Sequence, residues 1–167
     1  MNSGVLEIPS QAAKQQQLFT AVSRLRDPQA RFAWAVEQAR NRAPLPEELR
    51  IDAHRVTGCQ VRLWFVPEMG GGRCVFRTDS DAVTLKAMTG LLCELASGAT
   101  PAEVAACDFA FLEQFGLLRQ LAENRRATVL RVADQIRAFA AAHAPSASSG
   151  AVANAAAKSS RPAAAPN

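Results

Sequence analysis

The hydrophobic positions near the start of the chain recur with the spacing of an α-helix. In residues 11–25, one helical face carries the aliphatic side chains Leu18, Val22 and Leu25. Asp27 and Pro28 then combine an N-cap with a proline at the first helical position, which predicts a second helix that reaches about Arg42. The proline-containing stretch RAPLPEEL ends this helix.

From about His54 the hydrophobic period changes to two, which indicates β-strands. In the first run Val61, Leu63 and Phe65 alternate with Arg62 and Trp64, and in the second Cys74 and Phe76 alternate with Arg73 and Arg77. Three consecutive glycines, 70–72, separate the two runs and predict the turn of an antiparallel hairpin. A short third strand before Gly58 would extend this sheet.

The second half of the chain returns to helical spacing. The stretch TDSDAVTLKAMTGLLCELASG predicts a helix that Asp79 or Ser80 caps and Gly98 ends, with a core stripe of Leu85, Met88, Leu92 and Leu95. The letters TPAE at 100–103 contain a threonine cap, a proline and the returning glutamate of a capping box.

Two further helices complete the pattern. A short one is expected over residues 108–115, closed by Gly116. The last runs over residues 124–142, and its core face carries Val129, Val132, Ile136 and Phe139. Helices therefore flank one small antiparallel sheet, which is an α+β fold class.

Length and composition predict one domain with a tail. A chain of 167 residues has room for one ordinary domain, which we place at 1–143. Residues 144–167 are mostly Ala, Ser and Pro and are expected to be disordered. No apolar run approaches the roughly 20 residues of a membrane span, and the start lacks a secretory signal pattern. We therefore expect a cytoplasmic protein without a membrane partner.

The candidate chemistry lies among four cysteines. They form no C-x-x-C pair and no disulfide framework, so a structural metal site is not predicted. Cys74 and Cys93 lie on apolar faces and are interpreted as packing residues, as is Cys107. Cys59 differs, because it follows Gly58 at a junction of loop and strand, where a thiol can be presented.

The neighbours of Cys59 restrict what such a thiol can do. Acyl transfer by cysteine needs a base and an orienting group, and the chain has only His54 and His143. Attack on another sulfur needs only a thiolate and access, and Arg55 and Arg62 are close enough in sequence to favour a thiolate. Sulfur transfer is therefore chemically permissible.

Four segments resemble the SufE family of sulfur acceptor proteins: VTGCQVRLW, FRTDSDAVTLKAMTGLL, GATPAEVAACD and LLRQLAENRRATVL. The resemblance runs from about Gln17 to Phe139. It implies a SufE/IscU-like α+β fold in which the cysteine lies on a loop beside the sheet.

The resemblance also implies a function. Cys59 would accept persulfide sulfur from a SufS/CsdA-like cysteine desulfurase, enhance its turnover, and pass the sulfur to a SufBCD-like iron–sulfur cluster scaffold. The desulfurase would carry pyridoxal phosphate (PLP), whereas this chain would hold no cofactor beyond a transient persulfide, and no metal. It would act as an acceptor and activator rather than as a stand-alone enzyme.

Three other positions match the family's loop and partner contacts, namely Gly58, Asp81 and Arg125. The sequence departs from the family pattern at Val61, at Thr128 and in the letters LAEN before Arg125. These departures leave open which desulfurase and acceptor are recognised.

Other functions remain open from the residues alone. An iron–sulfur cluster scaffold would draw three or four ligands from the four cysteines and a histidine. A sulfur relay for another pathway is a further alternative. Nucleic-acid binding is not expected, because the net charge is only +4 and acidic residues are interleaved with the basic ones. We expect a monomer or a weak dimer.

Overall fold

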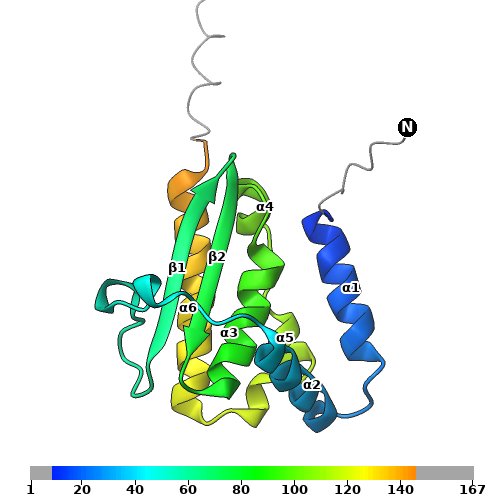
Figure 1. Cartoon of the computed structure of the whole chain (residues 1–167). Helices are drawn as coiled ribbons and strands as arrows, with labels where there is room; N and C mark the ends of the chain where they lie inside the picture. The colour runs from blue at the N-terminus through cyan, green and yellow to red at the C-terminus, as the bar shows by residue number, and fades with distance from the viewer. Residues whose placement is uncertain (1–8, 146–167) are drawn as a thin grey trace, which may run out of the picture.

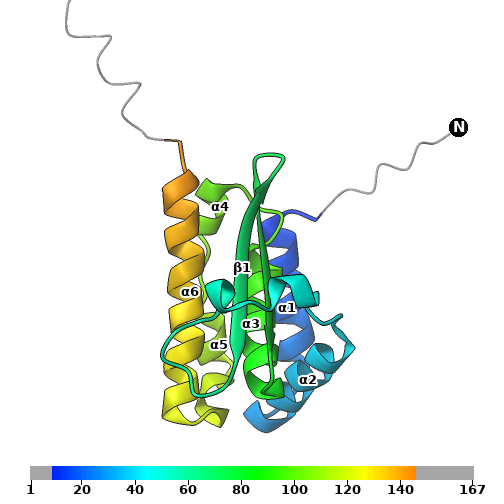
Figure 2. The same cartoon turned by 60° about the vertical axis from the view of Figure 1, so that its left-hand side comes forward.

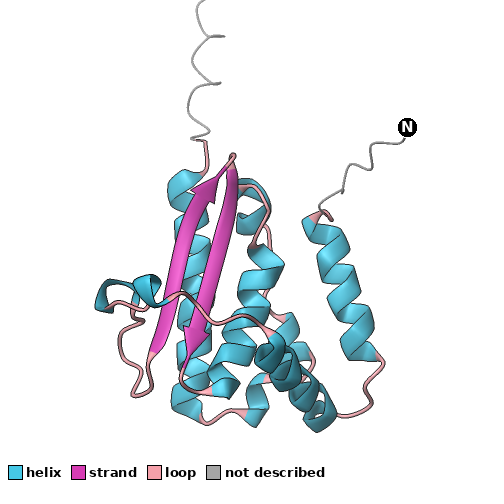
Figure 3. Cartoon of the chain, viewed as in Figure 1, coloured by secondary structure: helices cyan, strands magenta, loops and turns pink. Residues whose placement is uncertain are grey.

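The computed structural model describes residues 9–145, and these contain one β-hairpin whose one face packs against the long helices (Figure 3). Strands β1 (Leu63–Gly70) and β2 (Arg73–Ser80) pair antiparallel, in a register that runs from Leu63–Ser80 to Gly70–Arg73. Gly71 and Gly72 form the turn with φ of 58° and 76°, as a two-residue hairpin turn requires. The predicted hairpin and α+β class are confirmed.

The helices follow the predicted order closely. They are α1 (Gln11–Ser23), α2 (Pro28–Asn41), α3 (Val83–Ala96), α4 (Pro101–Ala105), α5 (Phe111–Gln114) and α6 (Glu123–His143). Three short 3-10 turns join them: η1 (Glu47–Leu49), η2 (Asp52–His54) and η3 (Leu118–Gln120). No helix within residues 9–145 combines the length and the apolar character needed to cross a membrane. The predicted tail lies outside the described residues from residue 146 onward.

The predicted caps at the starts of α2 and α4 are present. Asp27 caps α2 by accepting a hydrogen bond from the Ala30 amide at 2.8 Å. Thr100 and Glu103 form both hydrogen bonds of the capping box of α4. The predicted core stripe of α3 is buried, as are Val129, Val132 and Ile136 of α6.

The main core lies between the hairpin and the two central helices. In Figure 1 the hairpin lies across α6 and beside α3, and α1 stands at the outer side of the molecule. The sheet contributes Leu63, Phe65, Cys74 and Phe76 to this core, and Phe65 and Phe76 stack with ring centroids 5.9 Å apart. The two strands thus have one face fully covered by helices.

The two outer edges of the sheet differ. The first half of the outer edge of β2 is closed because the Cys74 amide donates to Ala99 O and the Gly98 amide donates to Cys74 O, both at 2.8 Å. Phe76 also directs its amide and carbonyl away from β1, toward the Ser97 hydroxyl. Pro67 faces Phe76 in the register, so it occupies a non-hydrogen-bonded pair and its nitrogen faces the free edge of β1.

The sheet differs from the sequence pattern in two details. The expected third strand is a single bridge between Arg55 and Trp64. Trp64 does not face solvent, because the second face of β1 is also covered: Trp64 and Val66 form a small second core with Leu45 and Leu49. Buried and exposed side chains do not alternate strictly along β1, because the proline-containing connection after α2 packs over the hairpin. No local sequence pattern indicates this packing.

A separate correction concerns Asp79 and Ser80, the predicted caps of α3. Both belong to β2, and α3 begins at Val83 with no side chain capping its first turn. The Ser80 hydroxyl accepts from the Ala82 amide at 3.2 Å, one residue before the helix. The Asp79 side chain points instead toward the connection over the sheet.

Asp79 is the most buried charged residue in the described part of the chain, at 1% exposure. Its carboxylate accepts from the Leu45 amide at 2.9 Å and from the Arg50 guanidinium at 2.5 Å. The Lys86 ammonium lies 3.4 Å away. Burial acts to raise the pKa of Asp79, but the hydrogen bonds from Leu45, Arg50 and Ser80 and the charge of Lys86 outweigh it, so the pKa lies below its ordinary value.

We predict that Asp79→Asn lowers the free energy of unfolding by about 3 kcal/mol, because it leaves Arg50 and Lys86 without their buried partner. The measurement is urea unfolding at pH 7. A lowered pKa stabilises the fold above the ordinary aspartate value of about 3.9 and loses this contribution as the pH falls below it. The wild type should therefore lose stability more steeply than Asp79→Asn below about pH 4.

Asp52→Asn is the matched control, since the Asp52 side chain is 98% exposed and its pairing with Arg55 spans 3.8 Å. Its stability should stay within about 0.5 kcal/mol of the wild type. Equal acid sensitivity of wild type and Asp79→Asn would contradict the role given to this carboxylate.

Candidate functional site

Cys59 lies in a closed loop between η2 and β1. The base of the loop is a hydrogen bond from the Val56 amide to Leu63 O at 2.9 Å, next to the Arg55–Trp64 bridge. Figure 2 shows this segment curving over α6 before it enters β1. Gly58 has a φ of +79°, a conformation that a residue with a side chain rarely adopts, so glycine is required directly before the cysteine.

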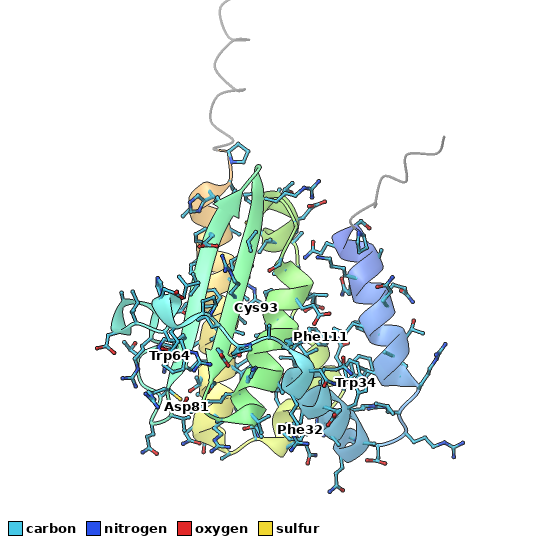
Figure 4. All side chains as sticks on the ribbon, viewed as in Figure 1. Phe32, Trp34, Trp64, Asp81, Cys93 and Phe111 are labelled. Atoms are coloured by element: carbon cyan, nitrogen blue, oxygen red, sulfur yellow. The ribbon has the colours of Figure 1, made fainter. Side chains whose placement is uncertain are left out.

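The C-terminal end of the loop is held by the residues that follow β2. The Asp81 amide donates to Arg62 O at 3.1 Å, and the Ser80 hydroxyl donates to the same oxygen at 2.7 Å. The Arg62 guanidinium in turn donates to the Asp81 carboxylate at 2.6 Å. Arg62 also lies over the Trp64 ring, 5.7 Å from its centroid, and Figure 4 shows Trp64 and Asp81 at this end of the sheet.

A pocket of about 170 Å³ lies between the loop and the start of α6. Its lining residues are Gly58, Cys59, Gln60, Val61, Asn124, Arg125 and Thr128. Cys59 is half-buried and packs against the edge of the main core. The site thus shelters the thiol on one side and leaves it a route to solvent.

Arg125 joins this pocket to α3. Its guanidinium donates to the Thr84 hydroxyl at 3.1 Å, which connects the first turn of α6 to the first turn of α3. Arg125 therefore stands at the wall of the pocket with its orientation fixed by a neutral partner.

The structure brings most of the predicted site residues together. Gly58, Cys59 and Arg125 line the one pocket, whereas Asp81 lies outside it and acts on the end of the loop through Arg62. The positions that depart from the family pattern also converge here, since Val61, Thr128 and Asn124 line the pocket.

Sequence reasoning missed Arg131, which lies on α6 and donates a hydrogen bond to Thr57 O at the start of the loop. The two residues are 74 positions apart, and an arginine in a helix carries no signal of such a contact. The arginines expected near the thiolate are paired elsewhere, Arg55 with Asp52 and Arg62 with Asp81.

Neither histidine of the chain lines the pocket of Cys59. His54 directs Nδ1 toward Leu49 O at 2.8 Å, and His143 directs Nδ1 toward Phe139 O at 2.8 Å. A thiol without an adjacent base is suited to exchange between sulfur atoms rather than to hydrolysis.

The other three thiols are buried in separate parts of the core. Cys74 is on β2, Cys93 is on α3, and Cys107 follows α4. Burial raises the pKa of each of them, to about 11 for Cys107, where the effect of burial exceeds the opposing effects of Gln11 and Arg137. Within residues 9–145, no three His, Cys, Asp or Glu side chains are grouped to hold a metal ion.

Comparison with known proteins identifies a family that matches most of this sequence. The family described as SufE, Fe-S metabolism associated domain, matches residues 16–140. An uncharacterized SufE-like protein of Synechocystis is 29% identical over 99 residues, which are 59% of this chain and 62% of that protein. The chain therefore matches less than two thirds of the length of this relative.

Two further proteins are similar over most of the chain. An uncharacterized SufE-like protein of Rhizobium etli is 28% identical over 127 residues, covering 71% of this chain and 86% of that protein. The solution structure of a hypothetical protein from Thermus thermophilus has the same fold, with a TM-score of 0.63 at 23% identity over 78% of this chain and 95% of that one. By the match over residues 16–140, the chain belongs to the SufE family of Fe-S metabolism associated domains.

Proposed function

We propose that this chain accepts sulfur on Cys59 from the persulfide of a cysteine desulfurase and passes it to an iron–sulfur cluster assembly scaffold. The observation that carries the proposal is the placement of one half-buried thiol in a closed loop, beside a pocket and without a histidine. Membership of the SufE family supports the same chemistry.

The proposed step is an exchange between sulfur atoms. The Cys59 thiolate attacks the terminal sulfur of the partner's cysteine persulfide and forms a new S–S bond. The S–S bond of the partner breaks, and its electron pair leaves with the partner's cysteine as a thiolate. The proton on the terminal sulfur is retained, so the transfer balances without an oxidant or a reductant.

The second transfer repeats this exchange with a thiol of the downstream scaffold. Removal of the persulfide frees the desulfurase for its next turnover, so the acceptor also activates that enzyme. The PLP that generates the persulfide belongs to the desulfurase, and this chain carries the sulfur only as a transient persulfide. In this proposal the protein acts in the cytoplasm, as a monomer or a weak dimer.

The alternative of a cluster scaffold finds no support in the described residues. Cys59, Cys74, Cys93 and Cys107 lie in different parts of the fold, and no set of three metal-binding side chains occurs within residues 9–145. Transfer of sulfur needs one accessible thiol, whereas a cluster needs three or four converging ligands.

The first prediction concerns thiol reactivity. At pH 8, a small alkylating reagent should modify the native protein once, on Cys59, because the other three thiols are buried and their pKa values are raised. Cys59 should react more slowly than an unfolded control peptide, since it is half-buried. Peptide mapping by mass spectrometry provides the measurement.

Two controls accompany this experiment. In denaturant all four cysteines should react, and native Cys59→Ser should gain no label. If Cys107 in the native protein were modified as fast as Cys59, the prediction that only Cys59 is accessible would be wrong. If Cys59 reacted as fast as the control peptide, the prediction that the loop shelters it would be wrong.

The second prediction tests the proposed function itself. Incubation with cysteine and a PLP-dependent desulfurase should add at least one sulfur atom to the wild type, located on the peptide that contains Cys59. Cys59→Ser should gain none and should keep its thermal stability, because the change removes a nucleophile and little packing. Intact-mass measurement under non-reducing conditions gives the result.

The buried cysteines provide the matched controls. Cys74→Ala and Cys93→Ala should load sulfur at the wild-type rate but unfold about 1 kcal/mol more easily, since each leaves a small cavity. Sulfur loading of Cys59→Ser, or loss of loading in Cys74→Ala or Cys93→Ala with unchanged stability, would refute the assignment of Cys59.

A further inference from the structure

The loop that carries Cys59 is held by hydrogen bonds at its two ends, whereas in its middle Cys59 and Val61 only pack against the core. At the C-terminal end Arg62 is bound by Ser80 and Asp81. At the N-terminal end the side chain of Arg131 donates to Thr57 O. The intervening residues 59–61 make no hydrogen bond within the described part of the chain.

Arg131 extends from the middle of α6 and lies directly under the loop. A Cβ atom added to Gly58 would lie 2.7 Å from Nη1 of Arg131 and 3.3 Å from its Cζ. The guanidinium thus fills the space in which a side chain at position 58 would stand. The positive φ of Gly58 is the reason for glycine before the cysteine, and the near contact shows how closely Arg131 approaches the loop.

The charge of Arg131 is not taken up by an acidic residue. Within residues 9–145 no carboxylate forms a salt bridge with it, whereas Arg137, six positions further along α6, pairs with Asp134 at 3.3 Å. The Thr57 carbonyl is thus the polar group to which the Arg131 guanidinium donates, in a charge-assisted hydrogen bond.

We propose that Arg131 is a positioning residue that holds the Cys59 loop closed against α6 and so regulates access to the thiol. This inference rests on the proposed sulfur-acceptor function for its purpose, but the contact itself is independent of any partner. A persulfide reacts with any accessible thiol, so a closed loop protects the sulfur from small thiols in solution. Release of Thr57 leaves only the core contacts of Cys59 and Val61 to hold residues 59–61, which can then move outward.

The proposal has a quantitative consequence for transfer. If only the open loop reaches the desulfurase, the apparent affinity is reduced by the fraction of molecules whose loop is open. Loss of one hydrogen bond to a partly exposed arginine should raise that fraction about fivefold. By setting the fraction of open loops, Arg131 then determines both how well the persulfide is protected and how readily it is transferred.

The test uses the full chain with Arg131→Ala, Arg131→Lys and the control Arg40→Ala, since within residues 9–145 Arg40 pairs only with the exposed Glu37. In the absence of any desulfurase, Cys59 alkylation should be about fivefold faster in Arg131→Ala and close to wild type in Arg40→Ala. Arg131→Lys, which keeps a charged donor, should restore much of the protection. Melting temperature is measured in parallel.

Two further measurements separate positioning from general stability. With desulfurase, Arg131→Ala should reach half-maximal sulfur transfer at about one fifth of the wild-type acceptor concentration, with an unchanged maximal rate. Persulfide loaded on Arg131→Ala should be lost to glutathione about fivefold faster than from the wild type.

Several outcomes would overturn the proposal. It fails if Arg131→Ala alkylates at the wild-type rate, or if its melting temperature falls and Cys74, Cys93 and Cys107 also become reactive. It also fails if Arg131→Lys behaves like Arg131→Ala. If the wild type itself gains no sulfur, the proposed function fails, while the alkylation rates still decide whether Arg131 holds the loop.

Discussion

The buried carboxylate of Asp79 fixes the path of the chain between α2 and β1. It binds the Leu45 amide and the Arg50 guanidinium, which lie on either side of η1 in the first half of this connection. This connection covers Trp64 and Val66, so β1 is buried on both faces where it begins. The chain between α2 and η2 is thereby fixed against β1, the strand into which the Cys59 loop leads.

Much of the fold could be predicted because its signals are local. The cap of α2 at Asp27, the capping box at Thr100 and the glycine turn of the hairpin each depend on residues within a few positions of one another. Helical faces were equally readable from spacing. Cys59 stood out for a related reason, because the glycine before it marks an unusual backbone conformation.

What could not be predicted depends on contacts between distant residues. Asp79 resembled a helix cap in sequence, but its partners Leu45 and Arg50 come from a segment about thirty positions earlier in the chain. Trp64 occupies an alternating position in the strand pattern, and only the packing of that distant segment buries it. Arg131 is one of several arginines on α6, and only the folded chain brings it to Thr57.

The pairing of the sheet also bears on how the protein behaves at high concentration. A two-stranded sheet has two edges that could recruit strands from other molecules. The edge of β2 is occupied by the backbone of Gly98 and Ala99. On the edge of β1, Pro67 supplies no hydrogen-bond donor, so an incoming strand meets an interrupted ladder. Pro67 thus leaves the pairing of β1 with β2 intact and hinders the addition of a further strand along the edge of β1.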